Sequence, residues 1–220
     1  RRVLFRSAKG AYGKVYGGTM LGVDIAVKKM NKPLDIHARC VPHDIFTEIL
    51  ILDKFKKDER ICKLIDYGVA DVIFQVKFNI QDNYYVVMKR YTTSLRDWRE
   101  KQTKSLEENL ELYLNIYQSV LENSCFLSEN RVNHYDIKCD NYLIEPMDPD
   151  TSLEEIYNQK NNHPNFHVRL ADFGESLVYT DEEDGFLKNY PRGTDCIRAP
   201  EMLRLGAQDD NVDRRKQVYF

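Results

Sequence analysis

Three groups near the start of the chain have the chemistry to bind a phosphate. Gly10 and Gly13 stand close together, and glycine lets the backbone approach phosphate oxygens with its N–H groups exposed. Lys28 ends the strand-like run at residues 25–28, and Glu48 lies on the inward face of a predicted helix. Because a buried lysine is costly without an opposite charge, Lys28 and Glu48 could pair and together hold a polyphosphate. Taken singly, these signals also fit an ordinary hairpin turn and a lysine whose ammonium lies in solvent.

A second set of motifs follows in a fixed order further along the chain. Residues 134–141 read HYDIKCDN, residues 172–174 read DFG, residues 193–194 read GT and residues 199–201 read APE. Together with the glycines, Lys28 and Glu48, these motifs resemble the eukaryotic-type protein kinase family, in its Ser/Thr branch. The resemblance covers essentially the whole chain. It implies an α+β, bilobal fold, with a small antiparallel sheet and one helix in the first lobe and a mainly helical second lobe.

The resemblance also implies a reaction, the transfer of the γ-phosphoryl group of ATP to a Ser or Thr hydroxyl of a protein substrate. ATP and Mg²⁺ are the implied cofactors. Asp136 would orient or accept the proton of the substrate hydroxyl, and Lys138 would reach the γ-phosphate. Asn141 and Asp172 would supply hard oxygen ligands to magnesium. The catalytic residues are thus expected to be Asp136, Lys138 and Asn141, with Asn141 and Asp172 as the metal ligands.

A larger set of residues is expected around the nucleotide, at its phosphates, its adenine or the hinge. These residues are Ala8, Gly10, Gly13, Val15, Ala26, Lys28, Glu48, Met88, Lys89, Tyr91 and Leu143. By resemblance, Met88 stands at the gate to the back of the pocket, and Lys89 and Tyr91 contact the base through backbone groups. A stack through both lobes is expected from Leu52, Leu64, His134 and Phe173.

The chain departs from the family pattern at several positions. Ala8 replaces the first of three glycines, which is expected to weaken ATP binding without abolishing it. Tyr135 replaces the arginine that normally receives an activation-loop phosphate, so we expect activity to depend little on phosphorylation there. Gln217 replaces an aspartate that fastens the catalytic loop. Residues 216–220 resemble only the start of the central C-lobe helix, so we expect a first lobe at 1–88, a hinge at 89–94 and a partial C-lobe at 95–220.

Hydrophobic periodicity predicts the elements that must position these residues. A helix is predicted between residues 42 and 55, where Ile45, Ile49 and Leu52 recur at helical spacing. A second helix is predicted over residues 107–126, opened by a capping box at Ser105 to Glu108. Its apolar stripe consists of Leu110, Leu114, Tyr117 and Leu121. Strands are predicted at residues 3–5, 14–16, 25–29, 63–67 and 84–88.

Residues 145–167 form an insertion, because the interval between Asn141 and Asp172 is longer than the family's usual short hairpin. The segment contains three prolines, a polar run and little periodicity. We therefore expect a surface loop that bulges outward without disturbing the site.

The composition excludes several other classes of protein. The chain has 220 residues, 42% of them hydrophobic, and its 35 acidic and 32 basic residues give a net charge of -3. Without a basic stripe or a long apolar run, neither a nucleic acid nor a membrane is an expected partner, and the oligomeric state is not indicated. The five cysteines form no CxxC pair, which favours reduced thiols and an intracellular, cytoplasmic location.

Two alternative functions remain at this level. A pseudokinase would keep the fold and bind nucleotide or partners without catalysis, although Lys28, Glu48, Asp136, Asn141 and Asp172 are all present. Small-molecule kinases that act on amino alcohols or antibiotics share the H-x-D-x-x-x-x-N pattern. Those enzymes lack the GT and APE motifs, which favour a protein kinase here.

Overall fold

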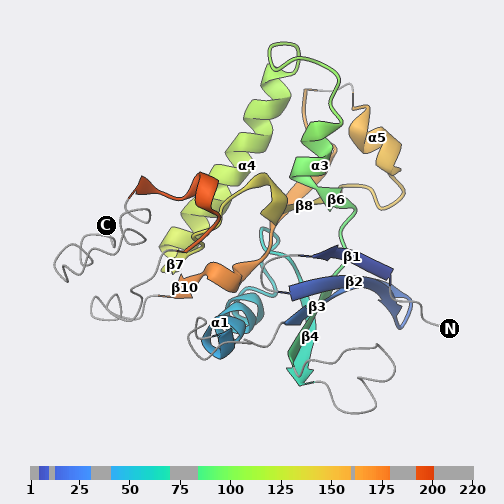
Figure 1. Ribbon diagram of the computed structural model, residues 1–220. Helices are drawn as coiled ribbons and strands as arrows, with labels where there is room; N and C mark the ends of the chain where they lie inside the picture. The colour runs from blue at the N-terminus through green and yellow to red at the C-terminus, as the bar shows by residue number, and fades with distance from the viewer. Residues whose placement is uncertain are drawn as a thin grey trace.

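A five-stranded antiparallel sheet forms the first lobe of the computed structural model (Figure 1). Its strands are β1 (Phe5–Lys9), β2 (Gly13–Met20), β3 (Val23–Met30), β4 (Leu64–Val69) and β5 (Tyr84–Lys89), in the order β1-β2-β3-β5-β4. The predicted strands are confirmed with shifted ends, and residues 3 and 4 lie outside the described part. The structure describes residues 5–9, 13–30, 41–69, 84–159, 162–178 and 192–200.

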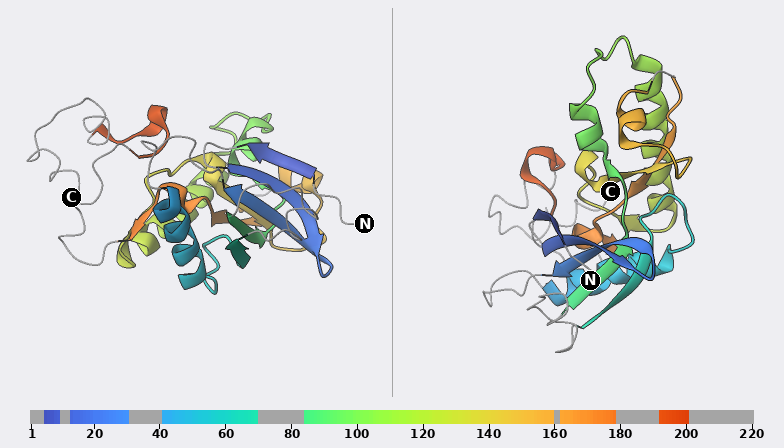
Figure 2. Two further views of the ribbon diagram at one scale, coloured as in Figure 1. Left: turned by 60° about the horizontal axis from the view of Figure 1, so that its bottom comes forward. Right: turned by 90° about the vertical axis from the view of Figure 1, so that its right-hand side faces the viewer.

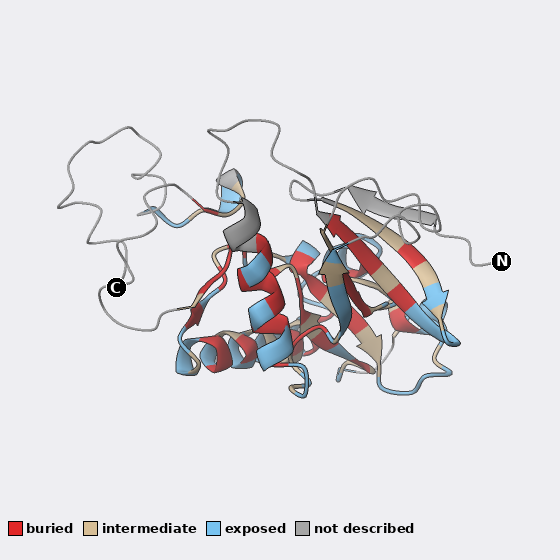
Figure 3. Cartoon of the chain, turned by 90° about the horizontal axis from the view of Figure 1, so that it is seen from below, coloured by how far each residue is buried: buried red, intermediate tan, exposed pale blue. Residues whose placement is uncertain are grey.

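Helix α1 (Val41–Lys54) packs against the sheet and confirms the helix predicted from apolar periodicity. Ile45, Ile49 and Leu52 are buried, whereas Phe46 and Leu50 are exposed, a division that can be followed in Figure 3. An amphipathic helix of this kind is stabilised mainly by the burial of its apolar face. The same face includes Glu48, which is 1% exposed.

The second lobe is mainly helical and begins with α3 (Leu95–Glu100). Ser94 caps this helix, because its hydroxyl accepts a hydrogen bond from the Asp97 amide. Leu95 and Trp98 are buried on its inner side. The two lobes and the path between them can be followed in the additional views of Figure 2.

The start of the long helix α4 (Leu110–Glu129) differs from the prediction. The capping box does form, since Ser105 and Glu108 exchange hydrogen bonds of 2.8 and 3.3 Å between their backbone amides and side chains. The capping box closes only a turn, however. The α-helix begins at residue 110, where the Tyr113 amide donates a hydrogen bond to the Asn109 carbonyl. The predicted start at residue 107 is therefore wrong by three residues, and the helix continues beyond the predicted end.

The apolar stripe expected on this helix lies on its exposed side. Leu110, Leu114, Tyr117 and Leu121 are all between 46% and 58% exposed. The buried side instead contains Leu112, Ile116, Phe126 and Leu127. Helix α4 is thus apolar on two faces, of which only one is covered by the described part of the chain.

Short strands and 3₁₀ turns position the motif residues. Strands β6 (Thr93–Ser94), β8 (Tyr142–Pro146) and β9 (Phe166–Leu170) form one sheet, and β7 (Val132–Asn133) pairs with β10 (Leu177–Val178). Short 3₁₀ helices lie at or beside the motif residues. They are η1 (Cys139–Asn141), η2 (Phe173–Glu175) and η4 (Asp195–Ile197).

The insertion at residues 145–167 is more ordered than the predicted surface loop. Its ends belong to β8 and β9, and it contains the helix α5 (Leu153–Tyr157), opened by a capping box between Ser152 and Glu155. Ile156 is completely buried, and the indole N–H of Trp98 donates to its backbone carbonyl over 3.0 Å. The prediction of a surface loop is wrong because Ile156 and Phe166 of the segment are buried, and Phe166 and the Ile156 carbonyl both contact Trp98 of α3.

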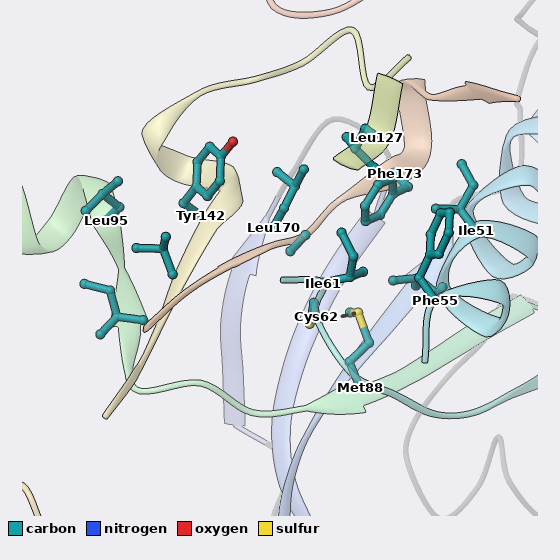
Figure 4. Close-up of a cluster of buried hydrophobic side chains, with 14 of the residues drawn as sticks. Ile51, Phe55, Ile61, Cys62, Met88, Leu95, Leu127, Tyr142, Leu170 and Phe173 are labelled. Atoms are coloured by element: carbon teal, nitrogen blue, oxygen red, sulfur yellow. Dashed lines mark hydrogen bonds between the residues drawn. The ribbon is translucent and has the colours of Figure 1, made fainter. Parts of the chain in front are cut away.

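A continuous apolar core joins the two lobes (Figure 4). Ile51 of α1 and Phe55, which directly follows this helix, approach Phe173, while Ile61 and Leu170 lie between them and the rest of the second lobe. Backbone hydrogen bonds reinforce the contact, because Cys62 donates to Leu170 and Leu170 donates to Arg60. Within the described ranges, no helix is both long and apolar enough to cross a bilayer.

Candidate active site

Lys28 on β3 meets two carboxylates at the junction of the lobes. Its Nζ lies 2.7 and 2.8 Å from the two carboxylate oxygens of Glu48 and 2.5 Å from Oδ1 of Asp172. Strand β3 and helix α1 supply the first pair from within one lobe, whereas Asp172 comes from the other. The expected contact between Lys28 and Glu48 is therefore present.

The charges of this cluster stabilise one another. Burial by itself lowers the pKa of Lys28, but Asp172 and Glu48 outweigh this effect and hold the pKa above its ordinary value. Burial would raise the pKa of Asp172, and the Lys28 charge brings it below the ordinary value. Lys28 and Asp172 are thus both charged at neutral pH. The Asp172 side chain remains 39% exposed, so it is accessible to a ligand.

Asp172 adopts a left-handed backbone conformation, with φ 62° and ψ 69°. This conformation is uncommon for a residue with a side chain and is more often found where the surrounding structure enforces it. The next residue, Phe173, is fully buried, and its ring centroid lies 4.9 Å from that of His134 in an edge-on arrangement. Packing of Phe173 in the interlobe core therefore helps to direct the Asp172 carboxylate toward Lys28.

Asp136 lies at the centre of a second polar cluster. Lys138 Nζ lies 2.7 Å from its Oδ2, and Asn141 Nδ2 donates to its Oδ2 over 3.1 Å and to its backbone carbonyl over 2.8 Å. Thr194 donates to Oδ1 from its amide and its hydroxyl. Burial acts to raise the pKa of Asp136, but the hydrogen bonds from Lys138 and Thr194 keep it below the ordinary value. The carboxylate is thus ionised and fixed in orientation.

The three expected catalytic residues are brought together with Asp172 by the short elements around them. Lys138 also donates to the Thr194 hydroxyl over 2.6 Å. The Ala171 amide donates to the Asn141 carbonyl over 2.8 Å, which places the segment of Asn141 beside that of Asp172. Asn141 directs its N–H groups toward Asp136, so its amide oxygen is the group suited to act as a ligand.

His134 supports this arrangement from the core. Its Nε2 lies 3.1 Å from the Ala171 carbonyl, and its Nδ1 lies 3.2 Å from the Asp136 amide. These partners assign the proton to Nε2, because a carbonyl can only accept and an amide can only donate. Burial lowers the pKa of His134, which favours the neutral ring. The expected structural role of His134 agrees with this position.

Tyr135 also has a left-handed backbone, with φ 61°. It brings a phenol rather than a guanidinium to this position, and its hydroxyl accepts a hydrogen bond from Asn133 Nδ2 over 3.2 Å. The Tyr135 carbonyl lies against Gly193, where an added Cβ would approach it to 2.1 Å. Gly193 has φ +83°, so glycine is required there for two separate reasons.

The residues expected around adenine come from both lobes, because Val15 and Ala26 lie on the neighbouring strands β2 and β3, whereas Leu143 lies on β8. Ala8 pairs with Val15 in the β1–β2 ladder, and Ala26 pairs with Met88 in the β3–β5 ladder. Val15, Ala26 and Leu143 are half-buried, as suits residues that line a pocket. Gly13 begins β2, whereas Gly10 lies outside the described residues.

Met88 and the hinge follow from β5. Met88 is 8% exposed and contacts the sulfur of Cys62 at 3.9 Å. The Lys89 amide donates to the Lys63 carbonyl, and the Lys63 amide donates to the hydroxyl of Tyr91. These bonds turn the Tyr91 side chain back toward β4, which is compatible with the expected use of backbone groups toward the base.

Sequence reasoning did not identify every residue of this region. The GT motif supported the family resemblance without a role for Thr194, yet Thr194 contacts both Asp136 and Lys138. Glu145 pairs with Lys89 of the hinge and with Arg169, and thereby ties the hinge to β8 and β9. The pair of Glu145 and Arg169 could have been found from the alternation of side chains along β8 and β9, which places both residues on one face of the sheet.

Comparisons with known proteins agree with the fold and the motifs. Residues 8–216 match the family described as Protein kinase domain. The chain is 48% identical over 222 residues to a probable serine/threonine-protein kinase of Dictyostelium discoideum, covering 98% of this chain and 9% of that protein. It is 26% identical over 208 residues to a putative serine/threonine-protein kinase/receptor of Acanthamoeba polyphaga mimivirus, covering 93% of this chain and 10% of that protein.

The chain belongs to the eukaryotic-type protein kinase family, with a relative in its Ser/Thr branch. It spans about a tenth of the length of these two relatives. The expected α+β bilobal fold is also confirmed.

Proposed function

We propose that this chain transfers the γ-phosphoryl group of ATP to Ser or Thr hydroxyls of protein substrates, with Mg²⁺ as cofactor. The observation that carries the proposal is the fixed, ionised Asp136, bound by Lys138, Asn141 and Thr194 beside the charged Lys28–Glu48–Asp172 cluster. Phosphoryl transfer depends mainly on positioning and charge stabilisation, and this arrangement supplies both.

The donor set suits magnesium bound to a nucleotide. Mg²⁺ prefers hard oxygen ligands and usually combines one or two side chains with substrate phosphates. The Asp172 carboxylate and the Asn141 amide oxygen are of this type. When bound, the metal would neutralise phosphate charge.

The remaining roles belong to the chain's own residues. Asp136 would orient the substrate hydroxyl and accept its proton, since its carboxylate is ionised at neutral pH. Lys138, whose side chain is 25% exposed beside Asp136, would approach the γ-phosphate from the same side. Lys28 would bind the other phosphates while Glu48 keeps it extended from β3.

The test separates catalysis from scaffolding. Magnesium-dependent thermal stabilisation by ATP measures nucleotide binding, and radiolabel transfer to a generic protein substrate measures catalysis. We expect both in the intact protein. Stabilisation without transfer would support a pseudokinase scaffold, and the absence of both would overturn the proposed nucleotide site.

An intracellular, cytoplasmic location remains a prediction from the cysteine pattern.

A further inference from the structure

Glu175 and Arg192 form a buried ion pair beside the site. They are separated by 17 positions, and their residues are only 2% and 1% exposed. Arg192 Nη1 donates to the Glu175 backbone carbonyl over 2.7 Å and lies 3.8 Å from Oε2 of its carboxylate. Charged side chains are rarely buried this deeply. Removing each ion from water costs on the order of several kcal/mol, which must be offset by favourable contacts.

The pair connects two segments that both reach the reacting groups. Glu175 ends η2, whose N-cap residue is Asp172. Arg192 directly precedes Gly193 and Thr194, and the Gly193 backbone also hydrogen-bonds the Glu175 carboxylate. Thr194 in turn donates twice to Asp136. A short chain of contacts therefore leads from Glu175 to the carboxylate of Asp136.

The backbone at residues 192–194 is held tightly on its other sides. Arg198 donates to the carbonyl of Arg192 over 3.0 Å and to that of Gly193 over 2.9 Å. Gly193 lies against the Tyr135 carbonyl without space for a side chain. A shift of Arg192 would therefore be passed to Thr194 rather than absorbed between them, because close-packed interiors transmit displacement.

We propose that Glu175 and Arg192 are positioning residues that hold Gly193 and Thr194 against Asp136 and thereby set the orientation of the catalytic carboxylate. The structural part of this inference stands on the contacts alone, whereas its effect on rate rests on the proposed phosphotransferase function. Neither residue is placed to touch nucleotide or substrate in the described structure. The buried pair would supply an internal charge contact in a chain that has Tyr135 in place of the usual arginine.

The first test compares Arg192→Met with Arg192→Lys in the intact protein. Methionine keeps a long side chain but removes the charge and the hydrogen bonds, whereas lysine restores a cation. We expect Arg192→Met to lower kcat by about tenfold or more, because small misplacements of a catalytic group have effects of that order. KM for ATP should remain within about twofold, since Lys28 and Glu48 are untouched. Arg192→Lys should recover most of kcat.

The matched control is Arg99→Met, which makes the same change at an exposed position on α3, where the guanidinium lies over Tyr113. We expect kcat of this variant to equal that of the wild type. A purely structural role of Arg192 would lower the folded fraction without changing kcat per nucleotide-binding molecule. Equal kcat in Arg192→Met and Arg99→Met, after this normalisation, would overturn the positioning role.

Hydrogen exchange provides a readout that does not depend on catalysis. The Thr194 amide donates to Asp136 and the Gly193 amide to Glu175, so Arg192→Met should accelerate exchange in a peptide that covers these residues. Peptides from β3 and β5 should exchange as in the wild type. Unchanged exchange at Gly193 and Thr194 would overturn the inference.

The two readouts also separate this inference from the proposed function. If the wild type transfers no phosphate while Arg192→Met still accelerates exchange at Thr194, the proposed function fails and the positioning contact stands. Should Arg192→Met not melt cooperatively, Glu175→Met replaces it, because methionine keeps the length of the side chain and removes both its charge and the acceptor of the Gly193 amide. The same exchange increase at Gly193 is then expected, and its absence would count against the pair.

Discussion

Thr194 donates both its backbone amide and its hydroxyl to a single oxygen of Asp136, over 3.0 and 2.7 Å. The other carboxylate oxygen faces Lys138 and Asn141. The two oxygens therefore have different surroundings, one fixed by a residue 58 positions away and the other by the local loop. A carboxylate fixed in this way needs little reorganisation during proton transfer, which is how preorganised groups lower a barrier.

The first prediction concerns Asp136→Asn. The amide keeps the size of the side chain but cannot accept the proton of a hydroxyl, so label transfer should fall by about 10²–10⁴-fold. The affinity for ATP with magnesium, measured by thermal shift, should change little, because Asp136 is not among the expected nucleotide contacts. Lys28→Met is the contrasting variant and should impair both binding and transfer. Wild-type turnover by Asp136→Asn would refute the catalytic assignment.

The second prediction concerns acid stability and His134. Burial lowers the pKa of this ring in the folded state below the ordinary value of 6.5. The unfolded chain therefore binds the proton first, so stability decreases as pH falls below about 6.5 until the folded pKa is reached. Protonation of Nδ1 would also break its hydrogen bond with the Asp136 amide.

The measurement is the melting temperature between pH 7.5 and 5 for wild type and His134→Phe. Phenylalanine retains a ring against Phe173 but does not titrate. We expect a flatter pH profile for the variant, although its stability at neutral pH should be lower because the Ala171 carbonyl loses its donor. Parallel profiles for the two proteins would show that His134 does not contribute to the acid dependence.

The third prediction concerns the insertion helix α5. Ile156 is completely buried, so Ile156→Ala should lower the free energy of unfolding by about 2–5 kcal/mol. Leu153→Ala on the same helix is the control, because Leu153 is 41% exposed and surface changes usually cost about 0.5 kcal/mol or less. Denaturant titration measures both. Equal small effects would mean that the insertion behaves as the loop expected from sequence.

The fourth prediction concerns the apolar stripe on α4. In this 220-residue chain, Leu114→Gln should reduce self-association, because it replaces an exposed leucine within a row of exposed apolar residues. Its effect on the free energy of unfolding should be about 0.5 kcal/mol or less.

Ile116→Gln is the matched control at a position only 5% exposed. It leaves a buried amide without its water and should cost about 3 kcal/mol or more. Light scattering and denaturant titration distinguish the two effects. If Leu114→Gln destabilises the chain as much as Ile116→Gln, the stripe is part of the core after all.

The residues that the motifs identified do come together, and the reason is physical. Lys28 and Glu48 need opposite charges once they are buried, so their residue types indicated this pair before any geometry was available. The contact of Lys28 with Asp172 was not predicted, because Asp172 was expected only as a metal ligand. Helix α1 was equally predictable, because one of its faces is buried and the other exposed.

Other features of the fold and the site could not be predicted from the sequence pattern. Helix α5 has five residues, fewer than two turns, so periodicity could not reveal it, although Ser152 and Glu155 have the same capping pattern that was recognised at Ser105. Helix α4 starts late because a capping box specifies a turn and not the length that follows. The contact of Glu175 with Arg192 joins residues without any regular spacing, so only tertiary structure could reveal it.

The insertion contacts the hinge directly, so changes in its sequence can affect the hinge. Tyr157 places its hydroxyl 3.2 Å from that of Thr93, and Gln102 donates to the Tyr157 carbonyl. Glu145 binds Lys89 at the base of the same insertion. Amino-acid changes accumulating in the insertion would therefore alter the hinge while every signature motif stayed the same. Two kinases with identical motifs can diverge in nucleotide affinity by this route, and a phylogeny built on motifs alone would not record it.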